Sequence, residues 1–285
     1  MVQIMIGTKI HKPGKISLSQ GIEKRIESMA HKKTVDRGWR REIIISRHFE
    51  GPTDLTLGGY ISGLMAAHLD SDTVEVTMRK PTLMERPLVL DTTTPDRVFL
   101  YDGDMLINEA RPFELEMEMP EPISLAEAKK ASRRDTVAAF PNCFGCGSAR
   151  TKDNGLHLRS GPVEGQKAVA VDWVPSAAVV GAKEGEKVPE TMVLTAMECP
   201  IAKAMELGDM RKPEEMAVLG RMTTKIMELP QVGEPSYFMG WPIERVGRRI
   251  EIAGTLNNER GETLAMTRLT FIVLREGASL FGRDA

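Results

Sequence analysis

The sequence predicts an α+β chain built from two similar units, each an antiparallel sheet wrapped around one long central helix. Three observations support this prediction. A helical segment rich in small and apolar residues occurs once in each half, several strand-like runs follow it each time, and a turn signal lies before the last strand of each half. The order of elements therefore repeats, and 285 residues are enough for two ordinary domains.

The first unit is predicted over residues 41–118, after an N-terminal extension over 1–40 that includes a short helix at 21–29. A strand over 42–49 precedes a helix over 56–69, TLGGYISGLMAAHL, whose small and apolar residues allow it to be enclosed on almost every side. Asp102-Gly103 predicts the hairpin turn that leads into the last strand. The strands that follow this helix are expected at 73–79, 87–93, 97–101 and 105–118.

The second unit is predicted over residues 140–276, after a linker over 119–139 and before a C-terminal tail over 277–285. Its helix is expected to begin at Pro189 and to end before Gly208, and Pro200 should kink or break it. Strands are expected at 167–174, 216–228, 236–244, 249–256 and 263–274. Two such units can pair their sheets and cover their open edges, which predicts an intrachain pseudo-dimer.

Composition restricts the partners. A net charge of −2 and a pI near 6.3 give no electrostatic case for nucleic acid or an anionic membrane surface, so a small molecule or another protein is expected. No apolar run approaches the roughly 20 residues that span a bilayer. Three cysteines do not suggest a disulfide framework, and a cytoplasmic protein is expected.

The middle of the chain carries a resemblance to a known family. Cys143-Phe-Gly-Cys146-Gly, a short polar insert, Asn154-Gly155-Leu and an alternating strand resemble the opening of hotdog-fold proteins of the acyl-CoA thioesterase superfamily. The first half contains comparable motifs, which are Phe49-Glu-Gly-Pro52 and a Gly58-Gly59-Tyr60 segment. Together these motifs resemble a group of bacterial proteins that carry two hotdog units in one chain.

The resemblance implies two tandem hotdog folds and an acyl thioester substrate, linked to coenzyme A or to an acyl-carrier protein. Hydrolysis would take place at the interface of the two units. No cofactor is expected beyond the coenzyme A that belongs to the substrate, and the pseudo-dimers could associate further into a homodimer.

Glu198 is the first candidate catalytic residue. Only the second helix carries a carboxylate at its centre, and the apolar neighbours of Glu198 should raise its pKa and suit it to general acid or base chemistry. Gly59 is the second candidate, because N–H groups at a helix start can hold an oxyanion. Gly58 and Tyr60 are expected to contact the substrate. The alternatives are a Glu198 that is solvated or only structural, and glycines that serve only packing.

Two other functions remain open. His48 in His48-Phe-Glu-Gly resembles the histidine of hotdog acyl-carrier-protein dehydratases, so a dyad of His48 with Glu198 would predict dehydration. A non-catalytic acyl-binding protein is the other alternative, because Leu57 and Val188-Pro-Glu stand where related thioesterases carry Asn and His-Gly-Gly.

The remaining candidates are two arginines and the cysteine pair. Arg79 and Arg221 follow the two helices at comparable places and could bind the phosphates of coenzyme A, or else form surface ion pairs. The Cys143-x-x-Cys146 spacing is compatible with zinc or redox chemistry, with His157 and Cys199 as the other zinc ligands to consider. A structural loop with free thiols and no metal is the expectation.

Overall fold

The computed structural model describes residues 35–133 and 138–275, which belong to one compact unit. The predicted helix at 21–29 and the predicted C-terminal tail lie outside the described residues. Among the residues described, no helix has both the length and the apolar character needed to cross a membrane.

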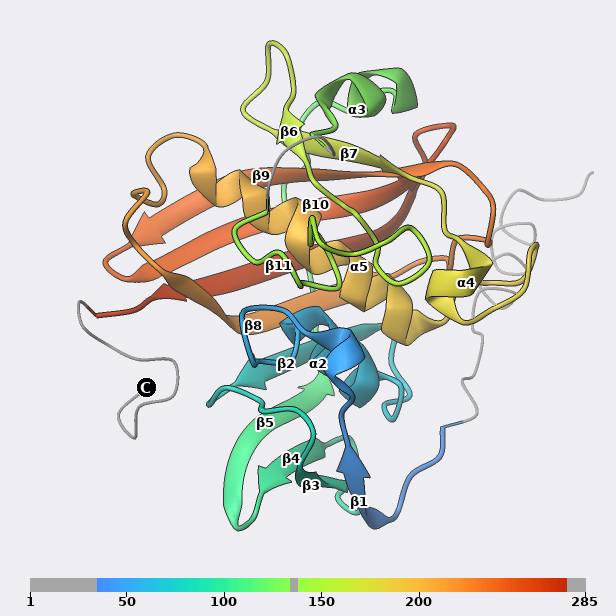
Figure 1. Cartoon of the computed structure of the whole chain (residues 1–285), viewed down its shortest axis with the longest axis vertical. Helices are drawn as coiled ribbons and strands as arrows, with labels where there is room; N and C mark the ends of the chain where they lie inside the picture. The colour runs from blue at the N-terminus through green and yellow to red at the C-terminus, as the bar shows by residue number, and fades with distance from the viewer. Residues whose placement is uncertain (1–34, 134–137, 276–285) are drawn as a thin grey trace, which may run out of the picture. The chain divides into compact units, whose positions relative to one another are not determined.

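One antiparallel sheet contains every strand that the described residues form (Figure 1). In chain order these strands are β1 (Arg40–Ile44), β2 (Thr73–Met78), β3 (Pro87–Asp91), β4 (Val98–Asp102), β5 (Met105–Pro112), β6 (Gly161–Pro162), β7 (Val169–Trp173), β8 (Ala217–Ile226), β9 (Ser236–Val246), β10 (Arg249–Asn258) and β11 (Thr263–Val273). Across the sheet the order is β1-β3-β4-β5-β2-β8-β11-β10-β9-β7-β6.

The strand order repeats about the pair β2 and β8. Each of these strands is the first to follow a long helix, and each pairs on its outer side with the last strand of its own half, β5 or β11. β2 pairs with β8 antiparallel, with Val74 opposite Thr224 and Val76 opposite Met222. Two sheets of equivalent topology are thus joined edge to edge, as the pseudo-dimer prediction requires.

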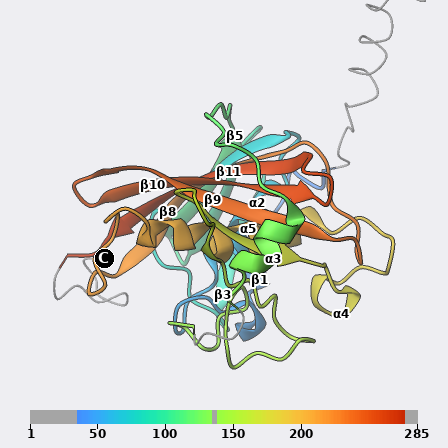
Figure 2. The same ribbon diagram turned by 90° about the horizontal axis from the view of Figure 1, so that it is seen from above.

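Two helices lie against the same core. α2 (Gly58–Ala66) belongs to the first half and α5 (Glu190–Ala202) to the second, and in Figure 1 α5 crosses in front of β9, β10 and β11 while α2 lies next to it. Seen from above, β10 and β11 lie along one side and α5 along the other (Figure 2). A single apolar core runs through both halves, and the inner side chains of both helices belong to it.

The first helix, α2, packs closely against α5 through two glycines. A Cβ on Gly63 would lie 2.5 Å from Cα of Thr191, and a Cβ on Gly59 would lie 2.6 Å from the carbonyl oxygen of Leu194. The two helices are therefore antiparallel and in backbone contact, because the later residue of α2 meets the earlier residue of α5. Only glycine permits this approach at both positions.

The second helix sits on a glycine pair in the sheet. Gly240 of β9 and Gly254 of β10 stand directly opposite each other, and a Cβ on either would come within 3 Å of Ile201. The missing side chains leave a groove in which the last turn of α5 lies. The helix runs through Pro200 without a break to Ala202 and then tightens into the 3₁₀ turn η2 (Lys203–Glu206), so the expected break near its middle is absent.

The predicted linker contains a packed helix. α3 (Leu125–Ala131) begins with a capping box in which Ser124 and Glu127 each bond the other's backbone N–H. Ala168 and Ala170 of β7 join α3 in a second apolar cluster, whereas the alternate residues Val169 and Val171 face the main core. α3 therefore covers the outer face of the second half, with the hydroxyl of Tyr237 donating to the carbonyl of Ile123 at 2.5 Å.

Some predicted bounds differ from the structure. The first strand ends at Ile44, and Arg47–Phe49 forms the 3₁₀ turn η1, where the hydroxyl of Ser46 accepts from the N–H of His48. β5 stops at Pro112, six residues before its predicted end at 118. The short helix α4 (Ala177–Val180) and the two-residue strand β6 were not predicted.

Candidate functional site

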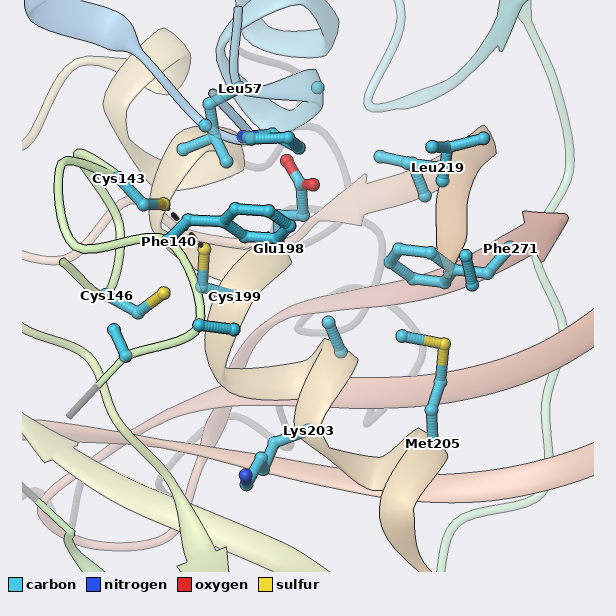
Figure 3. A pocket seen from close by; sticks show the side chains of 18 of the residues that line it. Leu57, Phe140, Cys143, Cys146, Glu198, Cys199, Lys203, Met205, Leu219 and Phe271 are labelled. Carbon is cyan, nitrogen blue, oxygen red and sulfur yellow. Dashed lines mark hydrogen bonds between the residues drawn. The ribbon is translucent and has the colours of Figure 1, made fainter. Parts of the chain in front are cut away.

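A cavity of about 410 Å³ opens where the two halves meet. Its wall combines the start of α2, the second half of α5 with η2, the beginning of β8, and the loop that carries Cys143 and Cys146. Figure 3 shows apolar side chains on opposite sides of this space, with Leu57 and Leu219 near Glu198, and Phe271 and Met205 further along. Most of the lining surface is apolar, which suits a hydrocarbon-bearing ligand.

Glu198 places a carboxylate in this apolar wall. Its side chain is 7% exposed, and one carboxylate oxygen accepts a hydrogen bond from the backbone N–H of Gly59. Burial raises the pKa of the Glu198 carboxyl from 4.5 to about 8, although the N–H groups of Gly59 and Gly58 favour its charged form. A protonation change at this carboxyl is thus possible near neutral pH.

The start of α2 explains why this carboxylate is held. Leu57 occupies the N-cap position and has no polar atom with which to satisfy the first free N–H groups of the helix. Glu198 supplies the acceptor from the other half of the chain, at the end of the helix where the dipole favours negative charge. One carboxylate therefore both caps α2 and faces the cavity.

The cysteine loop forms another part of the wall. The Sγ atoms of Cys143, Cys146 and Cys199 lie within 4.8 Å of one another, and Cys143 and Cys199 are 3.6 Å apart (Figure 3). Hydrogen bonds from the thiols of Cys146 and Cys199 hold the pKa of the Cys143 thiol well below its ordinary value. The pKa values of Cys146 and Cys199 are correspondingly raised, first of all by their bonds with Cys143.

Cationic side chains that the sequence did not single out line the same cavity. They are Lys80, which follows β2, Arg133 and Arg159 near the second unit's first strands, and Lys203 in η2. Lys203 forms an ion pair with Glu206 at 2.6 Å, and Arg159 donates to the carbonyl of Cys146 at 3.0 Å. Lys203 lies four residues, about one helical turn, beyond Cys199, and this spacing is a sequence signal that could have pointed to it.

Three of the predicted site residues come together. Glu198 and Gly58 line the cavity, and Gly59 bonds Glu198 directly. The Gly59 N–H, predicted as an oxyanion donor, is occupied by Glu198 in the structure. Tyr60 points elsewhere, because its ring stacks on Phe49 with centroids 3.7 Å apart, and it is not among the lining residues.

His48 is not brought to Glu198. Its ring packs against Phe49 and Phe144, each with centroids 4.9 Å away, and the side chain is exposed. Within residues 35–133 and 138–275, no hydrogen bond links His48 with Glu198, and His48 does not line the cavity. The predicted dyad therefore lacks the contact that a dehydratase site would need.

Arg79 directly follows β2, Arg221 lies in β8, and neither lines the cavity. Arg79 forms an ion pair with Glu109 at 2.6 Å, and Arg221 approaches the buried carboxylate of Glu75 at 3.8 Å. Glu75 also accepts from Arg111 at 2.8 Å. Both arginines thus have partners within the protein, and phosphate binding by either stays a prediction.

Comparison with known proteins shows the fold. The chain is similar to the tesB protein of Mycobacterium avium subs paratuberculosis (14% identity, 88% of this chain and 99% of that chain, TM-score 0.56). It is also similar to acyl-CoA thioesterase II TesB2 from Mycobacterium marinum (10%, 82% and 93%, 0.52). A third similar structure is a conserved protein with hot dog fold from Alicyclobacillus acidocaldarius (10%, 87% and 98%, 0.55).

These matches span nearly the whole length of the similar chains, and the chain has the fold of two tandem hotdog units that the sequence predicted. At 10–14% identity the likeness concerns the fold alone. No protein-family model matches the chain, and no curated protein sequence matches it.

Proposed function

We propose that the chain hydrolyses an acyl thioester, carried by coenzyme A or by an acyl-carrier protein, in the cavity where its two hotdog units meet. The observation that carries this proposal is the buried carboxylate of Glu198, bonded to the N-terminus of α2 and facing an apolar cavity of about 410 Å³. The names of two similar structures, tesB protein and acyl-CoA thioesterase II, support the same reaction class.

The proposed reaction begins with an exchange at the Gly59 N–H. The thioester carbonyl oxygen takes over this donor from Glu198, so that the N–H groups at the positive end of α2 face the oxygen on which negative charge develops. The released carboxylate accepts a proton from the attacking water. The new carbon–oxygen bond forms, the carbon–sulfur bond breaks, and the proton passes to the leaving thiolate.

The cavity wall fits both parts of such a substrate. Leu57, Leu219 and Phe271 provide apolar surface for an acyl chain, and Lys203 adds positive charge at the other end of the same cavity (Figure 3). A cationic side chain there would favour the phosphates of the carrier arm.

A panel of short, medium, branched and aromatic acyl-CoAs tests the proposal. Free coenzyme A should be measured by chromatography, because the three cysteines of the chain would react with a thiol reagent. We expect turnover on at least one member and a loss of about 10²-fold or more in Glu198→Gln. Glu228→Gln is the matched control, since Glu228 is exposed and pairs with Lys187 outside this cavity. Equal rates in Glu198→Gln and the wild type would contradict the role of Glu198.

A non-catalytic acyl-binding protein is the second candidate. The observation that favours it is the Gly59 N–H, which is already bonded to Glu198 and so is not free for an oxyanion. Absence of turnover on every acyl-CoA, together with a rise in melting temperature on adding one of them, would support binding without hydrolysis.

Further association is part of the same proposal. β1 is an edge strand of the sheet, and its residue Ile44 is 63% exposed. We therefore propose that two pseudo-dimers associate through β1. Sedimentation of the full chain should then show a homodimer, and Ile44→Lys should shift it toward the monomer. A cytoplasmic location also remains part of the proposal.

A further inference from the structure

Every cysteine of the chain lies in one cluster. The sequence contains three cysteines, and their sulfur atoms lie within 4.8 Å of one another although Cys199 is 56 positions beyond Cys143. Cys143 and Cys146 come from the loop at the start of the second unit, and Cys199 comes from α5. All three line the cavity (Figure 3).

The loop is held in the shape that gathers the sulfurs. Gly147 N–H donates to the carbonyl of Cys143 at 2.8 Å, and a Cβ on Gly147 would lie 2.4 Å from that same oxygen. A Cβ on Gly145 would lie 2.5 Å from Sγ of Cys199. Both glycines of the Cys-Phe-Gly-Cys-Gly loop are therefore needed for its turn and for its contact with α5.

Neighbouring segments fix the loop on both sides. The N–H of Phe144 donates to the carbonyl of Glu50 at 2.6 Å, and the carbonyl of Phe144 accepts from Leu156 at 2.8 Å. The carbonyl of Gly145 accepts from Leu158 at 2.9 Å. Backbone hydrogen bonds thus hold the loop in the conformation that brings the three sulfur atoms together.

We propose that Cys143, Cys146 and Cys199 bind a zinc ion whose fourth coordination position faces the cavity. Tetrahedral zinc with Zn–S bonds of about 2.3 Å places its sulfur ligands about 3.8 Å apart, and Sγ of Cys143 lies 3.6 Å from Sγ of Cys199. A ligand set made only of thiolates selects a soft ion such as zinc over magnesium or calcium.

The alternative arrangement of the sulfurs fits less well. A disulfide requires an S–S distance of about 2.05 Å and would leave the third thiol of the cluster without a role. A zinc ion uses all three sulfurs at once. This proposal departs from the expectation of a metal-free loop and does not rest on the proposed hydrolysis.

The fourth position has no protein ligand among the described residues. The carboxylate of Glu198 bonds the Gly59 N–H, and His157 is not part of the cluster. Three protein ligands with one position open to a cavity are typical of zinc sites that bind water or a ligand atom. The fourth ligand here would be water or a donor atom of the molecule in the cavity.

Metal analysis of the full chain tests the proposal. The chain should be purified under reducing conditions with any histidine tag removed, and its zinc content measured by mass spectrometry. We expect one zinc per chain in the wild type, one in Ser148→Ala as a control in the same loop, and a loss of most of it in Cys146→Ser. Retention of full zinc by Cys146→Ser would overturn the proposal.

Cobalt gives a second readout that does not depend on folding of the cysteine variant. Wild-type chain stripped of metal and kept reduced should show, on adding Co²⁺, the near-ultraviolet thiolate-to-cobalt band and the strong visible bands of a tetrahedral site. Zinc should then abolish both. A reduced wild-type chain that binds neither ion would overturn the proposal. Glu198→Gln should bind zinc normally, so failure of the metal site and failure of the hydrolase proposal are separately detected.

Discussion

The backbone N–H of Gly59 donates a hydrogen bond to the carboxylate of Glu198, 139 positions further along the chain. The donor is at the start of α2 in one hotdog unit, and the acceptor is on α5 of the other. α2 begins at Gly58 after an N-cap residue, Leu57, that has no polar side chain, and the neighbouring unit supplies the missing acceptor. This one hydrogen bond therefore both caps α2 and holds the carboxylate that faces the cavity.

The first prediction concerns the stability that this contact provides. Glu198→Gln keeps an oxygen acceptor for the Gly59 N–H, whereas Glu198→Ala removes it. We expect Glu198→Ala to be less stable than Glu198→Gln by about 1 kcal/mol, as for loss of a helix cap. Urea unfolding followed by circular dichroism measures the difference. Two variants of equal stability would mean that the bond contributes nothing to folding.

The second prediction concerns the packing of α2 on α5. Gly63→Ala would place a Cβ against backbone atoms of Thr191, which cannot turn aside, so we expect a loss of about 2 kcal/mol in the free energy of unfolding. Gly58→Ala is the control in the same helix. Its nearest neighbours are the ends of the Leu219 and Met78 side chains, which can move, and its cost should be clearly smaller. The reverse order would contradict the close approach of the helices.

The third prediction concerns α3. Tyr237→Phe removes the donor to the carbonyl of Ile123 and leaves this oxygen unpaired, at a cost of about 2 kcal/mol. The variant should also be cut faster by protease between the two units, because this bond fastens the segment before α3. Tyr101→Phe, on β4, is the comparison and should cost less than about 0.5 kcal/mol. Protection equal to that of the wild type would show that α3 is held by other contacts.

The fourth prediction concerns acid pH. Arg245 forms two hydrogen bonds of 2.7 Å with Glu215 and lowers the pKa of this carboxyl from 4.5 to about 2. A lowered pKa means that the folded state prefers the charged form, so this stabilisation is present above pH 4.5 and is lost as the pH falls toward 2. The stability difference between wild type and Glu215→Gln should therefore shrink over that range. A difference that stays constant from pH 6 to pH 2 would exclude the ion pair as its cause.

Local patterns were enough to predict most of the fold. The apolar runs with small residues became α2 and α5, and alternation in Lys167 to Val174 predicted β7 because its two faces pack against different clusters. Less of α3 could be predicted. Its polar outer face and its short apolar face resemble a solvated linker, and the cluster that it covers is assembled from strands far away in the sequence.

The site was predicted in part, for a similar reason. Glu198 could be recognised because it is an isolated carboxylate in an apolar helix. Cys199, its neighbour, was one of two possible partners considered for the cysteine loop, and only the folded chain shows that α5 brings Cys199 and not His157 to that loop. His48 and the two arginines were chosen by motif and position alone, and the structure gives them contacts with Phe144, Glu109 and Glu75.

Because β2 and β8 pair within one chain, the cavity should not depend on protein concentration. In a site shared by two separate subunits, lowering the protein concentration separates the halves and empties the site. Here the strands that join the halves belong to one polypeptide, so their encounter is intramolecular and their effective concentration is fixed by the connecting chain. The cavity should stay intact at any concentration at which the chain itself stays folded.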